Sequence, residues 1–160
     1  MRVSDVLSKE CVIPELKART KHEALAEMSA ALASRVGGLD GEGLLERLLE
    51  RERLGSTGIG YGVAIPHAKV KGIDAIVVGF ARSSPGVDFQ STDKMPVHLF
   101  FLIVAPEHST AAHLKVLAAI SRLLKDNGLR NALTQAATGD DIYRVIMEGD
   151  WRMSLRNAVI

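Results

Sequence analysis

Two apolar runs in the middle of the chain, residues 75–81 and 97–105, constrain the possible folds most strongly. Both are rich in β-branched or aromatic residues, and turn-rich sequence bounds each of them. Apolar runs of this length, without alternation, are typical of central strands that are buried on both faces of a sheet. We therefore expect two central strands, covered on both sides by the helices that the rest of the chain can form.

Helical patterns precede these two runs. Thr20 and Glu23 stand three residues apart, as a capping box requires, and Gly37-Gly38 is predicted to end the helix that they begin. The apolar residues of this helix recur at helical spacing: Leu25, Met28, Leu32 and Val36. A second helix is predicted after Asp40, with its leucines buried and the charges of residues 50–53 in solvent.

Helical patterns also follow the apolar runs. One helix is predicted to begin at Ser109 or Thr110 and to end at Asn127-Gly128, and a short helix should cover residues 129–137. Thr138 and Asp141 introduce a final helix, whereas residues 148–160 show no clear pattern. Strands flanked by helices in this order predict an α/β fold with a central mixed β-sheet and helices on both faces.

Composition limits the size and the partners of this fold. A chain of 160 residues with 47% hydrophobic content can bury one substantial core, so we expect a single domain. With 20 basic and 19 acidic residues the chain has no overall basic field, and nucleic acid is not an expected partner. Cys11 stands alone, no apolar run reaches membrane-spanning length, and no secretion signal begins the chain, so we expect a cytoplasmic protein without membrane insertion.

His67 follows Pro66 and a glycine-rich segment, GSTGIGYGVAIPHAKVKG, through whose first half neither a helix nor a regular strand can run without cost. An imidazole with an ordinary pKa near 6.5 is largely uncharged at neutral pH and can act as a nucleophile. The glycines would let backbone N–H groups approach a phosphoryl oxygen. The alternative is a tight turn with a structural histidine, and the segment is neither a P-loop nor a dinucleotide-binding motif.

Two further residues could assist such a nucleophile. His113 is predicted near the N-terminus of a helix, where unpaired N–H groups and the helix dipole favour an anion. Arg51 could hold two phosphoryl oxygens with its planar guanidinium group. The ordinary alternatives are a surface histidine in a first helical turn and an exposed charge at the end of a helix.

Other polar residues give weaker indications. Ser56 and Thr57 are hydroxyl donors ahead of the glycines, and loop capping is their ordinary role. His98 is expected to pack or hydrogen-bond within a strand, and the five-residue spacing of His108 and His113 argues against a metal site. We expect no metal and no cofactor, and the absence of a GxSxG motif argues against a serine hydrolase.

Residues 55–70, GSTGIGYGVAIPHAKV, resemble the active-site segment of the mannitol/fructose-type enzyme IIA domains of the bacterial sugar phosphotransferase system. The resemblance is strongest to the nitrogen-regulatory IIA proteins. The segment LLERERLGST resembles the family's helix end with Arg51, and PEHSTAAHLKVLAAISRLL resembles the stretch with its second histidine, His113. Similarity extends from VLSKEC to the final helix, which implies a IIA domain over residues 1–147 and a C-terminal tail over 148–160.

The resemblance implies a role for each matching residue. His67 would be phosphorylated by an HPr-like histidine phosphocarrier protein, with His113 and Arg51 as its hydrogen-bonding and electrostatic partners. The wall of the phosphate pocket would be built by Ser56, Thr57, Gly58, Gly60 and Gly62. Ala68 stands where relatives often have glycine, and its Cβ should slightly narrow access to the site.

The sequence is compatible with three functions. We expect a regulator whose phosphorylation changes which protein it binds, because the sequence carries no IIB or membrane IIC segment and GSTGIG resembles the nitrogen-regulatory branch. The alternative is a sugar-transport subunit that passes phosphate to a fructose or mannitol IIB domain. A ligand-binding module without phosphochemistry is the third, and it predicts that His67→Ala leaves every activity intact.

Overall fold

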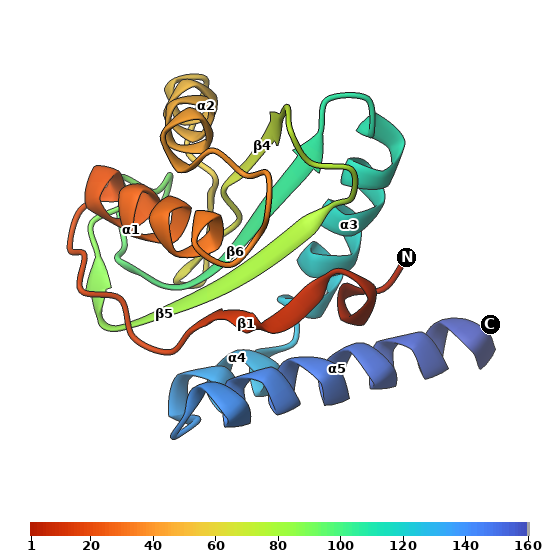
Figure 1. Ribbon diagram of the computed structural model, residues 1–160. Helices are drawn as coiled ribbons and strands as arrows, with labels where there is room; N and C mark the ends of the chain where they lie inside the picture. The colour runs from red at the N-terminus through yellow and green to blue at the C-terminus, as the bar shows by residue number, and fades with distance from the viewer. Residues whose placement is uncertain (160) are drawn as a thin grey trace.

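The strand β6 (Val97–Pro106) lies at the centre of a six-stranded mixed sheet in the computed structural model, which describes residues 1–159. It pairs antiparallel with β5 (Val77–Val87) on one side and parallel with both β3 (Val63–Ala64) and β4 (His67–Val70) on the other. The sheet is completed by β1 (Leu7–Ile13), parallel to β5, and by β2 (Gly58–Gly60), antiparallel to β3. The expected pair of central strands is confirmed, and Figure 1 shows them crossing the middle of the molecule.

Helices cover both faces of this sheet (Figure 1). The first face carries α1 (Lys21–Ala33) and α2 (Gly41–Arg53). The second carries α3 (Thr110–Leu123), α4 (Asn127–Gln135) and α5 (Gly139–Val159), together with a short 3-10 turn (Val3–Asp5). This arrangement confirms the predicted α/β class with a mixed sheet between two helical layers.

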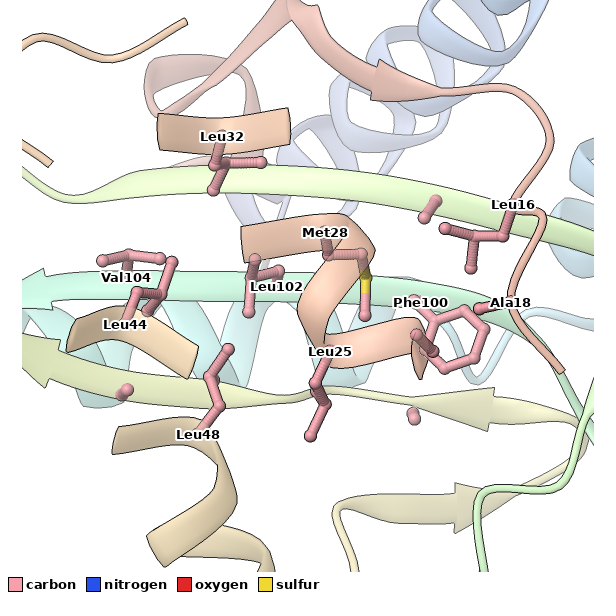
Figure 2. Close-up of a cluster of buried hydrophobic side chains, with 14 of the residues drawn as sticks. Leu16, Ala18, Leu25, Met28, Leu32, Leu44, Leu48, Phe100, Leu102 and Val104 are labelled. Carbon is pink, nitrogen blue, oxygen red and sulfur yellow. The ribbon is translucent and has the colours of Figure 1, made fainter. Parts of the chain in front are cut away.

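Alternation along β6 divides the buried side chains into two cores. Phe100, Leu102 and Val104 pack toward α1 and α2, where Figure 2 shows them facing leucines of both helices. Leu99, Phe101 and Ile103 belong to the second core, under α3, α4 and α5. Successive side chains of a strand point to opposite faces, so an unbroken apolar run fills both cores at once.

The caps of the first two helices follow the sequence closely. Thr20 accepts a hydrogen bond from the Glu23 backbone N–H, and Asp40 accepts one from Glu42 N–H, as N-cap residues do. The predicted end of α1 at Gly37-Gly38 is wrong, because the helix ends at Ala33. Val36 therefore packs against the core from the following turn instead of from the helix.

Other helices and strands begin or end at residues that differ from the predicted ones, because a helix cap or a strand pairing sets the boundary. The strand β5 continues past 81 to Val87, because its far end still pairs with Val97 at the start of β6. Asn127-Gly128 does not lie between two helices, since Asp126 accepts a hydrogen bond from Leu129 N–H and α4 begins at Asn127. The first half of the glycine-rich segment contains only the three-residue β2, whose pairing with β3 shifts in register.

The C-terminal tail continues the final helix. Thr138 Oγ1 accepts a hydrogen bond from Asp141 N–H, as expected, and α5 then runs without interruption from Gly139 to Val159. Asp150 is buried in this helix and accepts hydrogen bonds from Val3 N–H and Ser4 N–H, so the helix holds the N-terminal segment. The domain boundary at 147 stays a prediction, and Ile160 lies outside the described residues. Over residues 1–159, no helix is long and apolar enough to cross a membrane.

Candidate active site

His67 is the first residue of β4, and the pairing of β4 with β6 fixes its backbone opposite Ile103. Its half-buried ring lies with Nδ1 2.8 Å from the Ile65 carbonyl oxygen. A carbonyl oxygen can only accept a hydrogen bond, so Nδ1 carries the proton and donates it. In the neutral ring Nε2 is then the nitrogen with the free electron pair.

Arg51 lies in the last turn of α2 and reaches this second nitrogen. Its Nε–H donates to His67 Nε2 at 3.3 Å, and its Nη1 donates to the Gly55 carbonyl oxygen at 2.9 Å. The carbonyl bond anchors the guanidinium group, while the Nε bond marks Nε2 as an acceptor. Arg51 is therefore more than an exposed charge at a helix end.

His113 lies on α3, where its backbone N–H makes a first-turn hydrogen bond to Ser109 O. Its ring meets that of His67 edge to face, with the ring centroids 5.2 Å apart and an interplanar angle of 87°. His113 is only 5% exposed, so its interpretation as a surface histidine is wrong. Its Nδ1 is buried and has no hydrogen-bond partner among the described residues.

An open groove of about 480 Å³ runs over these three side chains, between α2, β4 and α3. Leu54, 85% exposed, adds an apolar edge to it. The groove is lined by Arg47, Glu50, Arg51, Leu54, His67, Ala68, Lys69 and His113. Three cationic side chains against one carboxylate give it a net positive lining that suits a phosphoryl group.

Lys69 is a groove residue that the sequence analysis missed. Its Nζ donates to Thr110 Oγ1 at 2.8 Å and so connects β4 with the first residue of α3. The sequence contains a signal that places Lys69 at the site. Lys69 stands two residues after His67, and alternate side chains of a strand share a face. Ala68 also lines the groove and belongs to the core on the α2 side.

Ser56, Thr57 and the three glycines Gly58, Gly60 and Gly62 lie outside the described lining of the groove. Ser56 Oγ accepts a hydrogen bond from Gly58 N–H, which is its capping role. Gly60 and Gly62 have positive φ angles of 91° and 74°, in the left-handed region that glycine adopts at low cost. Gly60 and Gly62 shape the β2–β3 turn, and a direct phosphate contact from any of these five residues stays a prediction.

Glu52 contradicts the prediction that the charges of residues 50–53 lie in solvent. It is 8% exposed, and its carboxylate accepts hydrogen bonds from Thr57 N–H at 3.2 and 3.1 Å. Lys21 Nζ lies 3.0 Å from the same carboxylate. Helical periodicity places Glu52 on the covered side of α2, and the buried carboxylate is compensated by a cation and a backbone donor.

Burial is the main influence on both histidines of the groove. It lowers the pKa of His67, as does the nearby Arg51 charge, although the hydrogen bond to Ile65 O and the Glu52 charge act in the opposite direction. Burial also lowers the pKa of His113, helped by His67 and Lys69. Both rings therefore favour the neutral form, in which His67 Nε2 can act as a nucleophile.

These pKa shifts predict a loss of stability in acid. The unfolded chain has imidazoles of ordinary pKa, near 6.5, so below about that pH it binds protons that the folded chain rejects. The free energy of unfolding should therefore fall as the pH drops from about 7.5 to about 5.5, measured by urea titration. His67→Gln should lose less stability over that interval, with His108→Gln, at an exposed position, as the control. Equal losses in wild type and His67→Gln would contradict this assignment.

His98 has a local explanation. His98 Nδ1 lies 2.9 Å from Ser83 O, which confirms a hydrogen bond between neighbouring strands. Among residues 1–159, no group of three or more histidine, cysteine or carboxylate side chains is arranged to hold a metal ion.

The fold and the groove together define a class of protein, a small α/β domain in which two histidines and an arginine meet at one open groove. Residues 5–149 match the family model of the phosphoenolpyruvate-dependent sugar phosphotransferase system, EIIA 2. The chain belongs to this family, and the resemblance drawn from residues 55–70 is confirmed.

Relatives from several organisms share nearly the whole chain. A nitrogen regulatory protein of Bradyrhizobium diazoefficiens is 42% identical over 91% of this chain and 95% of that protein. A fructose-specific EIIA component of Haloferax volcanii is 35% identical over 91% of this chain and 95% of its own length. The crystal structure of the nitrogen regulatory protein IIA-Ntr from Neisseria meningitidis superposes with a TM-score of 0.83 at 28% identity, covering 90% of this chain and 98% of that one.

Proposed function

We propose that this chain accepts a phosphoryl group on Nε2 of His67 from an HPr-like histidine phosphocarrier protein. The hydrogen-bonding pattern of the ring carries the proposal. Nδ1 donates to Ile65 O, so the electron pair of the neutral imidazole lies on Nε2, at the groove and next to Arg51. A nucleophile held in one tautomer avoids the cost of reorganising when the donor arrives.

The transfer step balances within the two imidazoles. Nε2 of His67 attacks the phosphorus atom, the phosphorus–nitrogen bond of the donor histidine breaks, and the electron pair returns to the donor ring. The transition state is loose and in line, so positioning and charge supply most of the acceleration. Arg51 would exchange its hydrogen bond to Nε2 for one to a phosphoryl oxygen, and His113, edge to face with His67, would contact a second oxygen.

A regulatory role, of the nitrogen-regulatory type, is the function that the similarities favour. The identity to a nitrogen regulatory protein, at 42%, exceeds that to the fructose-specific component, at 35%. Phosphorylation would place a charge of about −1.5 to −2 among Arg47, Arg51 and Lys69. That change alters the charge of the groove, which is the surface that a target protein would contact.

The test is intact-protein mass spectrometry after incubation with phosphoenolpyruvate, a general enzyme I and an HPr-like phosphocarrier. A gain of one acid-labile phosphoryl group supports the proposal, and no gain with several donors contradicts it. The phosphorylated protein is then mixed with purified fructose and mannitol IIB domains. Transfer to a IIB domain at a rate comparable with phosphorylation of this chain would favour the sugar-transport alternative over regulation.

A further inference from the structure

Arg51 and Glu52 lie next to each other near the end of α2 and point in different directions. Arg51 extends to the groove and His67, whereas Glu52 turns into the protein, where its side chain is 4% exposed. Consecutive residues of a helix are about 100° apart around its axis, so neighbouring side chains can serve two different environments. A carboxylate buried at the C-terminal end of a helix is unfavourable on its own, which raises the question of its role.

A series of hydrogen bonds joins the Glu52 carboxylate to the imidazole of His67. The carboxylate accepts from Thr57 N–H at 3.2 and 3.1 Å, and Thr57 O accepts from Ile65 N–H at 3.0 Å. Ile65 O in turn accepts from His67 Nδ1–H at 2.8 Å. Thr57 and Ile65 each donate from their own N–H and accept on their own carbonyl oxygen, so the series passes from residue to residue and fixes the Ile65 carbonyl opposite the ring.

Lys21 fixes the other end of this series. Its Nζ lies 3.0 Å from Glu52 Oε1 and 4.9 Å from the centre of the Phe89 ring. Lys21 is itself the first residue of α1, so the series ties the start of α1 and the end of α2 to the strand that carries His67.

We propose that Glu52 is a positioning residue for phosphoryl acceptance, which acts on His67 by holding Thr57 and Ile65 in place. This inference rests on the proposed function, since it concerns the same nucleophile. The N–H and the carbonyl of one residue belong to different peptide groups, so the carboxylate acts by position. Its charge-assisted hydrogen bond to Thr57 N–H holds the residue whose carbonyl oxygen binds Ile65 N–H. An Ile65 carbonyl fixed 2.8 Å from Nδ1 holds the proton there and keeps the electron pair on Nε2.

The arrangement divides the control of one imidazole between two neighbouring residues. Arg51 contacts Nε2 directly, and Glu52 acts on Nδ1 from a distance. At metal sites, a carboxylate or carbonyl commonly orients a histidine by accepting a hydrogen bond from the ring nitrogen that does not bind the metal. Removing that acceptor typically lowers metal affinity or activity 10-fold to 100-fold. We therefore expect a loss of about 10-fold when the charge of Glu52 is removed.

The experiment compares Glu52→Gln with Glu46→Gln, which removes the same charge from an exposed position on the same helix. Phosphorylation by the HPr-like donor is measured over a range of donor concentrations. Glu52→Gln should lower kcat about 10-fold and leave KM unchanged, because the carboxylate is buried beneath the groove and outside its lining. Nitrogen-15 NMR of the His67 ring should show less of the Nδ1–H tautomer than in wild type, and Glu46→Gln should match wild type in both measurements.

A purely structural role would lower the melting temperature and leave kcat and the tautomer of the folded protein unchanged, and that result would overturn the inference. If Glu52→Gln does not fold, hydrogen exchange of the wild type decides. The Thr57 and Ile65 amides should exchange slowly in the folded protein, whereas fast exchange at either amide would refute the series of hydrogen bonds. If wild type itself accepts no phosphoryl group, the proposed function fails, while the tautomer and exchange measurements still test the connection to Glu52.

Discussion

Replacing His67 by glutamine is expected to abolish phosphoryl acceptance. Glutamine keeps a polar group of similar reach beside Arg51 and Ile65, but an amide nitrogen has no electron pair available to attack phosphorus. Wild type should gain one phosphoryl group in intact-protein mass spectrometry, and His67→Gln should gain none at any donor concentration. His108→Gln, which removes an exposed imidazole ahead of α3, should behave as wild type.

His67→Gln should lose phosphoryl acceptance because the nucleophile is missing, and not because the protein misfolds. His67 is only half-buried, and its backbone pairing with β6 does not depend on the side chain. The circular dichroism spectrum of His67→Gln should therefore match that of wild type. A variant that folds and still gains an acid-labile phosphoryl group would transfer the nucleophilic role to another residue, with His113 as the first to test.

The layered fold could be predicted because its decisive signals are local. The apolar run of β6 supplies side chains to both cores, and such a run is incompatible with a sheet that has one face in water. Thr20 and Asp40 mark helix starts by hydrogen bonds that reach no further than three residues. The end of α1 and the far end of β5 were mispredicted, since the packing of Val36 and the pairing of Val87 with Val97 depend on distant parts of the chain.

The candidate site was only partly accessible from sequence. Pro66 and the glycines singled out His67, but nothing in the spacing of Arg51 and His113 shows that α2 and α3 bring both to the same ring; the family resemblance supplied that link. Glu52 and Lys69 were missed for a related reason. In the run ERER every charge has the same local pattern, and only the packing of α2 against its neighbours decides which one is buried.

Arg51→Gln should slow phosphoryl acceptance by about 100-fold to 1,000-fold, the typical cost of removing one preorganised donor to a developing anionic charge. The guanidinium group is held over the site by Gly55 O, so its charge is in place before the donor arrives. Glutamine can neither supply that charge nor reach two oxygens at once. The rate is measured by rapid quench with saturating HPr-like donor, so that weaker docking does not contribute.

Two companion variants separate the charge of Arg51 from its geometry. Arg51→Lys keeps a positive charge but loses the planar pair of donors, so its rate should lie between those of wild type and Arg51→Gln. Arg53→Gln removes an exposed arginine two residues further along, outside the groove lining, and should retain the wild-type rate. If Arg51→Gln and Arg53→Gln slowed phosphoryl acceptance by the same factor, the general positive charge of the surface would explain the loss of rate. The hydrogen bond from Arg51 to Nε2 would then serve only to hold the resting imidazole, and His113 would remain as the side chain beside His67 that could contact the transferred group.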